Sequence, residues 1–290
     1  MNQTIKEIGK KIVAFIPSKM WLSYRFKKKT GYAMDWKNPK TYNQKLQWLK
    51  VNDKNPLYTD LVDKYEVKKY IADRIGEQYI IPTLGVWNSF DQIDFDSLPD
   101  RFVLKCTHDS GGIAIVKDKS TFDKEKARKR FKIALGRNPY DVTREWPYKN
   151  VKPRIIAEQY MENEATQDLR DYKFFSFDGQ TKAMFIATER ASETEETKFD
   201  FFDMEYNHLD FQNGHPNADV LPEKPLRFDE MRALADKLSK GIPQVRVDFY
   251  EVNGKVYFGE MTFFHWSGMK PFDPEEWDRK FGDWIKLPVI

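Results

Sequence analysis

The stretch that decides the fold reads QVRVDFYEVNGKVYFGEMTF and covers residues 244–263. Two runs of strand-forming residues flank Asn253-Gly254, a dipeptide that favours a tight turn, so the stretch predicts a β-hairpin. Side chains two residues apart on a strand share a face of the sheet, which places Arg246 with Asp248. With Glu260 on the second strand, these carboxylates suit a hard cation with oxygen ligands. The alternative is a plain salt bridge across the strands.

The length of the hairpin loop decides whether the two acids lie on one face. A two-residue turn at Asn253-Gly254 would turn Glu260 to the wrong face, because a register change of one residue reverses every side chain. We therefore expect a three-residue loop over 252–254, which pairs Glu251 with Lys255. Its glycine would take the left-handed conformation of a G1 bulge.

A second stretch, FVLKCTHDSGGIAIVKDK (102–119), predicts a strand, a glycine turn and another strand. Glycines let backbone N–H groups approach an oxyanion closely, so Ser110-Gly111-Gly112 suits an anion, and Lys105 could neutralise phosphate charge. The P-loop spacing is absent, and an ordinary tight hairpin is the alternative. We expect Arg246 and the two acids of the first hairpin to face the same cleft as Lys105.

The rest of the chain predicts separate helices and hairpin-linked strands, which together indicate an α+β fold with mostly antiparallel sheet. Turn and cap signals at Thr41, Gly76 and Asp178-Gly179 set several of the boundaries. We expect helices over 38–50, 58–76, 121–135 and 229–242, strands over 79–87 and 154–161, a hairpin over 171–190, and long loops over 136–153 and 191–225.

Charge is distributed unevenly over the 290 residues, whose formal net charge is +3. Residues 1–30 hold eight Lys and Arg against one Glu, so this segment carries +7 and the remainder −4. The only cysteine, Cys106, excludes an internal disulfide and is compatible with a reducing cytosol. The sequence shows neither a signal peptide nor an apolar run of the roughly 18 residues that would span a membrane. The basic residues lack a groove-reading motif, which argues against nucleic acid as a partner.

An amphipathic helix is expected over residues 3–16, with lysines opposite an isoleucine-rich face. Two interpretations are open. The helix docks on its own domain, or residues 1–30 lie on an anionic membrane surface, as basic amphipathic helices do.

Four motifs taken in order resemble those of a known family. They are DKYEVKKYI with Lys64, the Lys105 strand with its glycine loop, RIIAEQYM with Glu158, and the RVDF…GEMTF hairpin. The order resembles the ATP-grasp superfamily, which includes D-alanine–D-alanine ligase. Within it, these stretches and DLRDYKFFSFDG are similar to the branch named for teichuronopeptide biosynthesis, often labelled glycosyltransferase or polysaccharide-biosynthesis protein. The resemblance covers about residues 35 to 290.

The resemblance implies an ATP-grasp fold, in which two α+β subdomains with mostly antiparallel sheets clasp a nucleotide. We expect a helical basic segment over 1–57 and the ATP-grasp module over 58–290. Within the module, about 79–160 would form the small nucleotide-closing subdomain, and 161–290 the larger subdomain with the metal site. The α/β domain that usually precedes the ATP module is missing here.

The resemblance also implies roles for single residues. Arg246 would lie beside the reacting carboxylate and, with Lys105, act in catalysis. Thr262 stands where the family usually has a third metal ligand, Asn, and a hydroxyl can still ligate a metal or hold its water. The implied ligands are Lys64, Lys105 and Lys173 for ATP phosphates, Ser110, Gly111 and Gly112 for the closing loop, Glu158 and the backbone of Gln159, Tyr160 and Met161 for adenine, and Asp248, Glu260 and Thr262 for Mg²⁺.

The implied reaction is an ATP- and Mg²⁺-dependent ligation in the cytoplasm. A carboxylate becomes an acyl phosphate and then an amide, with a sugar or amino acid of a surface glycan as substrate. Two alternatives are open: a glycosyltransferase that uses a nucleotide sugar, and a module that binds nucleotide without turnover. The Asp-x-Asp metal motif of many glycosyltransferases occurs only as DFD at 94–96.

Overall fold

The computed structural model describes residues 15–163, 169–189 and 196–289. The helix expected over residues 3–16 therefore lies outside the described residues, apart from its last two positions. Within the described ranges, no helix is long and apolar enough to cross a lipid bilayer.

The described residues before β1 (Thr83–Trp87) form helices and turns. Helix α2 covers Ser18–Thr30 and α3 covers Tyr42–Asn52. Thr41 caps α3 as predicted, because its side chain accepts a hydrogen bond from the backbone N–H of Gln44. The Gln44 side chain in turn accepts from the backbone N–H of Thr41, which completes a capping box. Helix α2 buries Leu22 and Phe26.

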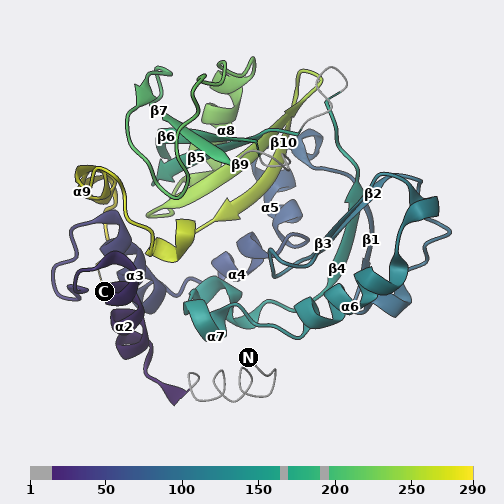
Figure 1. Ribbon diagram of the computed structural model, residues 1–290, viewed down its shortest axis with the longest axis horizontal. Coiled ribbons are helices and arrows are strands. Elements are labelled where there is room, and N and C mark those ends of the chain that lie inside the picture. Colours follow the sequence, from purple (N-terminus) through teal and green to yellow (C-terminus); the bar gives the residue numbers. More distant parts are fainter. Residues whose placement is uncertain (1–14, 164–168, 190–195, 290) are drawn as a thin grey trace.

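The single helix predicted over 58–76 is wrong. The chain forms α4 (Leu57–Val62) and α5 (Val67–Arg74), separated by a turn at residues 63–66. Gly76 follows α5 with a positive φ of 117°, which agrees with the predicted end of the helix. Figure 1 shows α4 and α5 running between the two sheets of the molecule.

The first sheet has four antiparallel strands in the order β1-β4-β2-β3. Their core contains Phe102, Leu104 and Phe131, and α6 packs on it through Phe131. The strand predicted over 79–87 begins later, after a 3₁₀ turn at Glu77–Tyr79, and short helices interrupt the loop predicted over 136–153. The bounds are β1 Thr83–Trp87, β2 Phe102–Cys106, β3 Ile113–Val116, β4 Ile155–Gln159, α6 Lys124–Leu135 and α7 Tyr140–Thr143, with 3₁₀ turns η2 Phe90–Gln92, η3 Lys119–Thr121 and η4 Trp146–Asn150.

The second sheet has six antiparallel strands in the order β10-β9-β5-β6-β7-β8. Helix α8 (Phe228–Ser239) packs on one face, where Phe228 lies 5.9 Å from Phe174, ring centre to ring centre. The long loop predicted over 191–225 is wrong in part, because it contains two strands of this sheet, β7 and β8. The bounds are β5 Asp171–Phe177, β6 Gln180–Thr188, β7 Lys198–Phe202, β8 His208–Leu209, β9 Val245–Val252 and β10 Lys255–Thr262.

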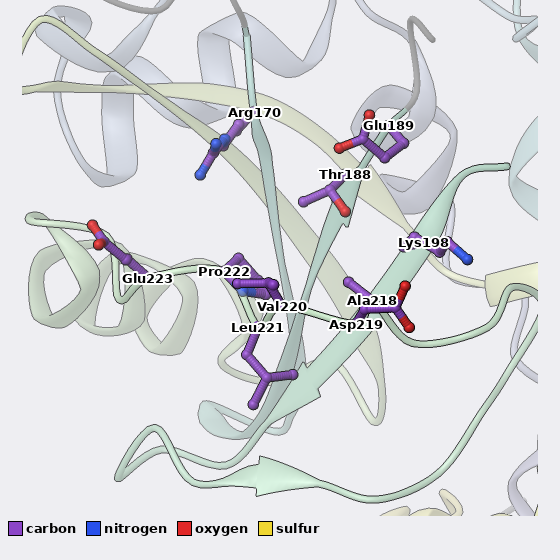
Figure 2. A pocket seen from close by; sticks show the side chains of 10 residues that line it. All are labelled: Arg170, Thr188, Glu189, Lys198, Ala218, Asp219, Val220, Leu221, Pro222 and Glu223. Atoms are coloured by element: carbon purple, nitrogen blue, oxygen red, sulfur yellow. The ribbon is translucent and has the colours of Figure 1, made fainter. Parts of the chain in front are cut away.

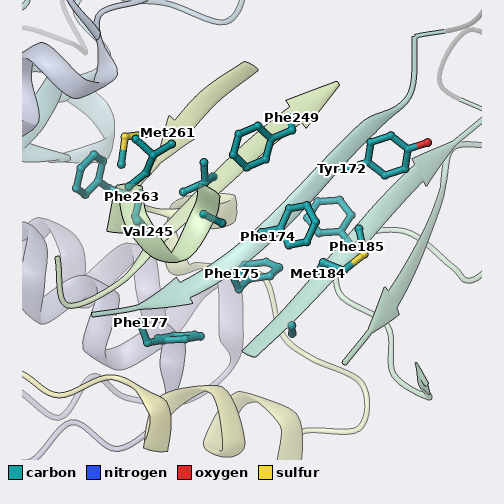
Figure 3. Close-up of a cluster of buried hydrophobic side chains, with 14 of the residues drawn as sticks. Tyr172, Phe174, Phe175, Phe177, Met184, Phe185, Val245, Phe249, Met261 and Phe263 are labelled. Carbon is teal, nitrogen blue, oxygen red and sulfur yellow. The ribbon is translucent and has the colours of Figure 1, made fainter. Parts of the chain in front are cut away.

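Aromatic side chains fill the core around the second sheet. Figure 3 shows phenylalanines of β5, β6 and β9 on both sides of the strands. The chain then passes through a 3₁₀ turn, η5 (His265–Gly268), to α9 (Glu276–Trp284), which packs against α3. Figure 1 places α2, α3 and α9 at one end of the molecule, with α3 between α2 and α9, so helices from the beginning and the end of the described chain lie together.

The predicted three-residue loop of the β9–β10 hairpin is wrong. Lys255 pairs with Val252, so Asn253-Gly254 forms a two-residue turn, and both residues have positive φ. The bulge lies further along, at Gly259, between the pairs Phe258–Phe249 and Glu260–Asp248. This extra residue shifts the register by one position, so Glu260 stands beside Asp248 on one face after all.

Candidate functional site

Charged side chains form a grid on the face of the second sheet opposite α8. Lys173 on β5 stands opposite Asp248 on β9, which stands opposite Glu260 on β10. In the next row Arg246 stands opposite Thr262. Arg246, Asp248 and Glu260 therefore lie on one face of the sheet, as expected. Lys173 lies beside them.

Arg246 is held at several of its nitrogen atoms. Its Nε donates to Asp248 Oδ1 and its Nη2 to Asp248 Oδ2, both at 2.7 Å. Nη2 also contacts Glu260 Oε1 at 3.2 Å and Thr262 Oγ1 at 3.0 Å. Lys173 Nζ donates to Asp248 Oδ2 at 2.5 Å. The buried carboxylate of Asp248 is thus shared by two cations.

The electrostatics of the grid favour ionised groups. Burial acts to raise the pKa of Glu260, but Lys173, Lys64 and Arg246 lower it to about 2. Its side chain is still 45% exposed. Burial lowers the pKa of Lys173, partly offset by Asp248. Glu260 therefore presents a stable negative charge to the space in front of the sheet.

A cavity of about 190 Å³ separates this grid from the first sheet. Both sheets contribute to its walls, so residues far apart in sequence meet there. The first sheet and its neighbours contribute Lys64, Lys105, Asp109, Ser110, Gly112 and Ile113, and the second sheet contributes Asp171, Lys173, Tyr250, Gly259 and Glu260.

Lys64 reaches the cavity because the chain breaks between α4 and α5. Asp63 accepts hydrogen bonds from the backbone N–H groups of Tyr65 and Glu66, at 2.8 and 3.2 Å, and is ion-paired with Arg154 at 2.8 Å. The Lys64 N–H donates to Thr107 O at 3.0 Å and its Nζ donates to Asp109 O at 3.1 Å. The break therefore ties Lys64 to the loop that precedes the glycines.

Lys105 shares Glu158 with a lysine that the sequence analysis missed. Lys105 Nζ is 2.7 Å from Glu158 Oε2, and Lys68 Nζ is 2.6 Å from Oε1. Burial opposes ionisation of Glu158, but the two lysines lower its pKa. The three side chains line a narrower cavity with Ile81 and Phe258. Lys68 lies in α5, whereas Lys64 lies in the turn before it, so their four-residue spacing is not that of one helix, and no local signal identified Lys68.

The other predicted nucleotide residues lie near these cavities without lining them. Gln159 ends β4, is exposed, and donates its N–H to Pro82 O at 3.0 Å. Tyr160 lies under the guanidinium of Arg101, 4.2 Å from the ring centre. The backbone N–H of Gly111 donates a hydrogen bond to the side chain of Asp109. Met161 is not among the lining residues of either cavity.

The donor set for a metal is present only in part. Asp248 and Glu260 are neighbours on one face, and the Thr262 hydroxyl is 3.2 Å from Glu260 Oε1. However, both oxygens of Asp248 are bound by Arg246 and Lys173, and no cluster of three His, Cys, Asp or Glu side chains suited to a metal occurs in the described ranges. Hard oxygen donors fit Mg²⁺, with Glu260 the more open of the two carboxylates.

A larger hollow of about 430 Å³ lies away from these residues (Figure 2). Thr188 and Lys198, at the ends of β6 and β7, and residues 218–223 before α8 form its walls. It contains no predicted site residue. The two aspartates of DFD at 94–96 are also remote from the cavity, in an exposed turn after η2.

Comparisons with known proteins found a matching family model and several similar solved structures. The sequence model described as TupA-like ATPgrasp matches residues 44–286. No curated protein matches the chain. Solved structures that resemble it include D-alanine–D-alanine ligase from Bacillus anthracis with ATP (14% identity, TM-score 0.40, 70% of this chain and 54% of that one).

Two further solved structures are similar to the chain. N5-carboxyaminoimidazole synthase from Aspergillus clavatus, with ADP and 5-aminoimidazole ribonucleotide, is 13% identical (TM-score 0.40, 72% of this chain and 46% of that one). The ATP-grasp ligase PsnB, with its minimal precursor, Mg and ADP, is 11% identical (TM-score 0.39, 76% and 57%). The chain spans about half the length of these solved proteins.

Proposed function

The chain belongs to the TupA-like ATP-grasp family, and from this premise we propose that it is an ATP-dependent ligase that joins a carboxylate to an amine. The observation that supports the proposal is the cavity between the two sheets, where Lys64 and Lys105 face Glu260. Phosphate chains need cations and backbone N–H groups on one side and a divalent cation on the other. In this cavity Lys64 and Lys105 supply the cations on one side, and Glu260 supplies a carboxylate for the divalent cation on the other.

We propose that the nucleotide phosphates bind between Lys64, Lys105 and Lys173, under the loop of Ser110, Gly111 and Gly112. Lys105 would then exchange its contact with Glu158 for a phosphate oxygen, while Lys68 keeps Glu158 ionised. Adenine would lie near the end of β4, by Glu158, Gln159, Tyr160 and Met161. Mg²⁺ would be held by Glu260, Asp248 and Thr262, and would supply neutralisation of phosphate charge.

In the proposed reaction, Arg246 orients the acceptor carboxylate. A carboxylate oxygen attacks the γ-phosphorus of ATP, the bond to the β–γ bridging oxygen breaks, and ADP leaves. An amine then attacks the acyl carbon, a proton is lost from nitrogen, and inorganic phosphate leaves as the amide forms. The guanidinium of Arg246 stabilises the oxyanion that forms transiently when the amine attacks the acyl carbon.

The proposal extends to the class of substrate and to the location of the protein. We propose a sugar or amino acid of a surface glycan as substrate, and a cytoplasmic protein that touches the inner face of the membrane through residues 1–30. Described residues of this segment support the second point: Phe15 and Met20, near the start of α2, are 89% and 65% exposed, and the last turn of the same helix is basic. Anionic lipids attract such segments.

Thermal unfolding with added nucleotide tests the proposal first. ATP with Mg²⁺ should raise the melting temperature, because a ligand of the folded state at a hundredfold excess over its Kd adds about 2.7 kcal/mol of stability. A shift with nucleotide sugars in place of ATP would contradict the ligase and favour a glycosyltransferase. ADP and UDP release are then followed separately, with carboxylates and amines added. ATP binding without carboxylate-dependent ADP release would indicate a module that only binds nucleotide.

A further inference from the structure

His265 contacts the guanidinium of Arg246 from the side opposite Asp248. The residue begins η5, three positions after the end of β10, and its ring is buried. Arg246 Nη1 lies 2.8 Å from His265 Nδ1. Since an arginine guanidinium has only donors, the imidazole must accept through Nδ1.

A second contact fixes the tautomer of this ring. His265 Nε2 lies 3.0 Å from Asn213 Oδ1, while Asn213 Nδ2 donates to the backbone oxygens of Lys270 and Pro271, at 3.1 and 3.0 Å. Asn213 therefore presents its oxygen to the ring. Nε2 must carry the proton, and Nδ1 keeps its lone pair for Arg246.

Aromatic rings complete the setting of the two residues. Phe175 meets the imidazole edge to face at 5.1 Å, and the guanidinium carbon of Arg246 lies 5.6 Å from the centre of the Phe185 ring. The guanidinium is thus restrained on one edge by a carboxylate, on another by a neutral nitrogen, and at its face by an aromatic ring. A planar donor held in this way has little freedom to rotate.

A neutral acceptor positions Arg246 without cancelling its charge. The grid contains two cations, Arg246 and Lys173, and two anions, Asp248 and Glu260. A third carboxylate in place of His265 would give the grid a net negative charge and repel an incoming carboxylate or phosphate. The imidazole fixes the direction of the guanidinium and leaves its charge for the substrate.

We propose that His265 is a positioning residue, which holds Arg246 in the orientation needed to meet the reacting carboxylate. The proposal deepens the ligase function and rests on it for its kinetic consequence. The hydrogen bond itself does not depend on that function, and it can be tested separately. The experiment therefore has a spectroscopic and a kinetic arm.

The spectroscopic arm uses the full chain with ¹⁵N-labelled histidine. The sequence has four histidines, so each ring can be assigned with a His→Gln variant. We expect His265 to show the Nε2–H tautomer and to stay neutral from about pH 5.5 to pH 8, where an ordinary histidine titrates. Burial lowers the pKa of the His265 ring well below its ordinary value, and the cations that face the ring, Arg246 and Lys173, lower it further. Its Nδ1 signal should shift in Arg246→Lys. An Nδ1–H tautomer or a charged ring in the wild-type chain would overturn the proposal.

The kinetic arm compares His265→Leu with His265→Gln. Leu removes the acceptor, and we expect kcat for ADP formation to fall about a hundredfold, as small misplacements of a reacting group do. Gln offers an amide oxygen and should recover most of this loss. The Kd for ADP should stay within about twofold in both, because Arg246 is placed at the carboxylate and not at the nucleotide. His208→Leu, on β8, is the control.

The outcomes separate the two proposals. If the wild-type chain binds ATP but forms no ADP with any carboxylate, the ligase function fails, and the spectroscopic arm still decides whether His265 holds Arg246. If the chain is active and His265→Leu is as active as the wild type, the positioning role is overturned while the ligase function stands. Equal losses of kcat in His265→Leu and His265→Gln, with both variants folded, would also overturn it.

Discussion

Lys105 is the residue whose role can be tested most directly. Lys105→Ala should weaken ATP binding at least tenfold, because a hydrogen bond to a charged group contributes about 1.5 to 3 kcal/mol. Asp248→Asn should lower turnover more than binding. Isothermal titration with ADP and Mg²⁺ measures the first effect, and ADP release the second.

Lys117→Ala is the matched control for Lys105, because Lys117 is exposed and directly follows β3, the partner strand of β2. It should bind ATP like the wild type. If Lys105→Ala and Asp248→Asn both keep full affinity and full activity, these residues do not form the site.

Acid stability reports on Glu260. Its folded-state pKa is about 2 against an ordinary 4.5, so between these values the unfolded chain binds more protons than the folded one. Stability from this group is then complete above about pH 4.5 and is lost as the pH falls towards 2. Glu260→Gln should therefore flatten the dependence of the free energy of unfolding on pH in this window.

Urea unfolding at a series of pH values measures this slope. Glu276→Gln, on an exposed position of α9, is the control for removal of a carboxylate. An unchanged slope in Glu260→Gln would show that the lysines and Arg246 do not stabilise the ionised form of Glu260.

At the scale of elements, the break between α4 and α5 sets the position of Lys64. Asp63→Ala removes both the hydrogen bonds that its side chain accepts from the backbone of the turn before α5 and its ion pair with Arg154. Loss of a side chain that accepts backbone N–H groups in this way costs about 1 kcal/mol, and the loss of one of the two carboxylate partners of Arg154 adds to this. We expect lower stability in urea and a weaker affinity for ATP.

Glu66→Gln is the matched control for this break. Glu66 contacts the same arginine at 2.8 Å, but its side chain is 46% exposed and does not accept from the backbone of the turn. It should change stability and affinity far less than Asp63→Ala. Equal effects of the two variants would mean that the charge of Arg154, and not the hydrogen bonds of Asp63 to the turn, governs the position of Lys64.

The elements show which parts of the fold local sequence can predict. The helix cap at Thr41, the Asp178-Gly179 turn and the hairpins were predicted because each depends on a few neighbouring residues. The break at residues 63–66 was missed because the apolar pattern continues across it, while Arg154, which pairs with Asp63 in the break, lies far away in sequence. Strands β7 and β8 were missed because they are defined by pairing, of β7 with β6 and of β8 with β7, and not by a local pattern.

The candidate site was predicted in composition but not in detail. Lys105 and Glu260 line one cavity as expected, together with Lys64 and Lys173, but Arg246 and Asp248 are not among its lining residues. Asp248 and Glu260 lie on one face of the sheet, as predicted, but the predicted reason was wrong. The bulge that sets their register is at Gly259 and not in the turn. A Cβ at Gly259 would lie 3.0 Å from Asp248 O, a closeness that only the folded register reveals. His265 and Lys68 contact partners that are distant in sequence, so no local sequence pattern identifies either residue.

At the scale of the whole molecule, the basic segment should be separable from the nucleotide site. Deleting residues 1–16 should leave ATP binding intact and reduce binding to vesicles with anionic lipid, because the deleted residues carry three of the lysines of the segment. Co-sedimentation with anionic vesicles measures this, and neutral vesicles are the control. Insoluble protein after the deletion would instead favour a helix docked on its own domain.

The packing of α3 on the last part of the chain has a consequence for synthesis on the ribosome. The buried side chains of Asn43 and Gln47 donate to the backbone of Lys270 and Gly268, residues made more than 220 positions later. At about 5 to 20 residues per second, α3 waits roughly ten seconds to most of a minute for these partners. During that time its apolar residues, Leu46 and Leu49, have no complete core to enter. Helix α3 thus leaves the ribosome well before the residues that bury it, and it stays open to a chaperone until they are made.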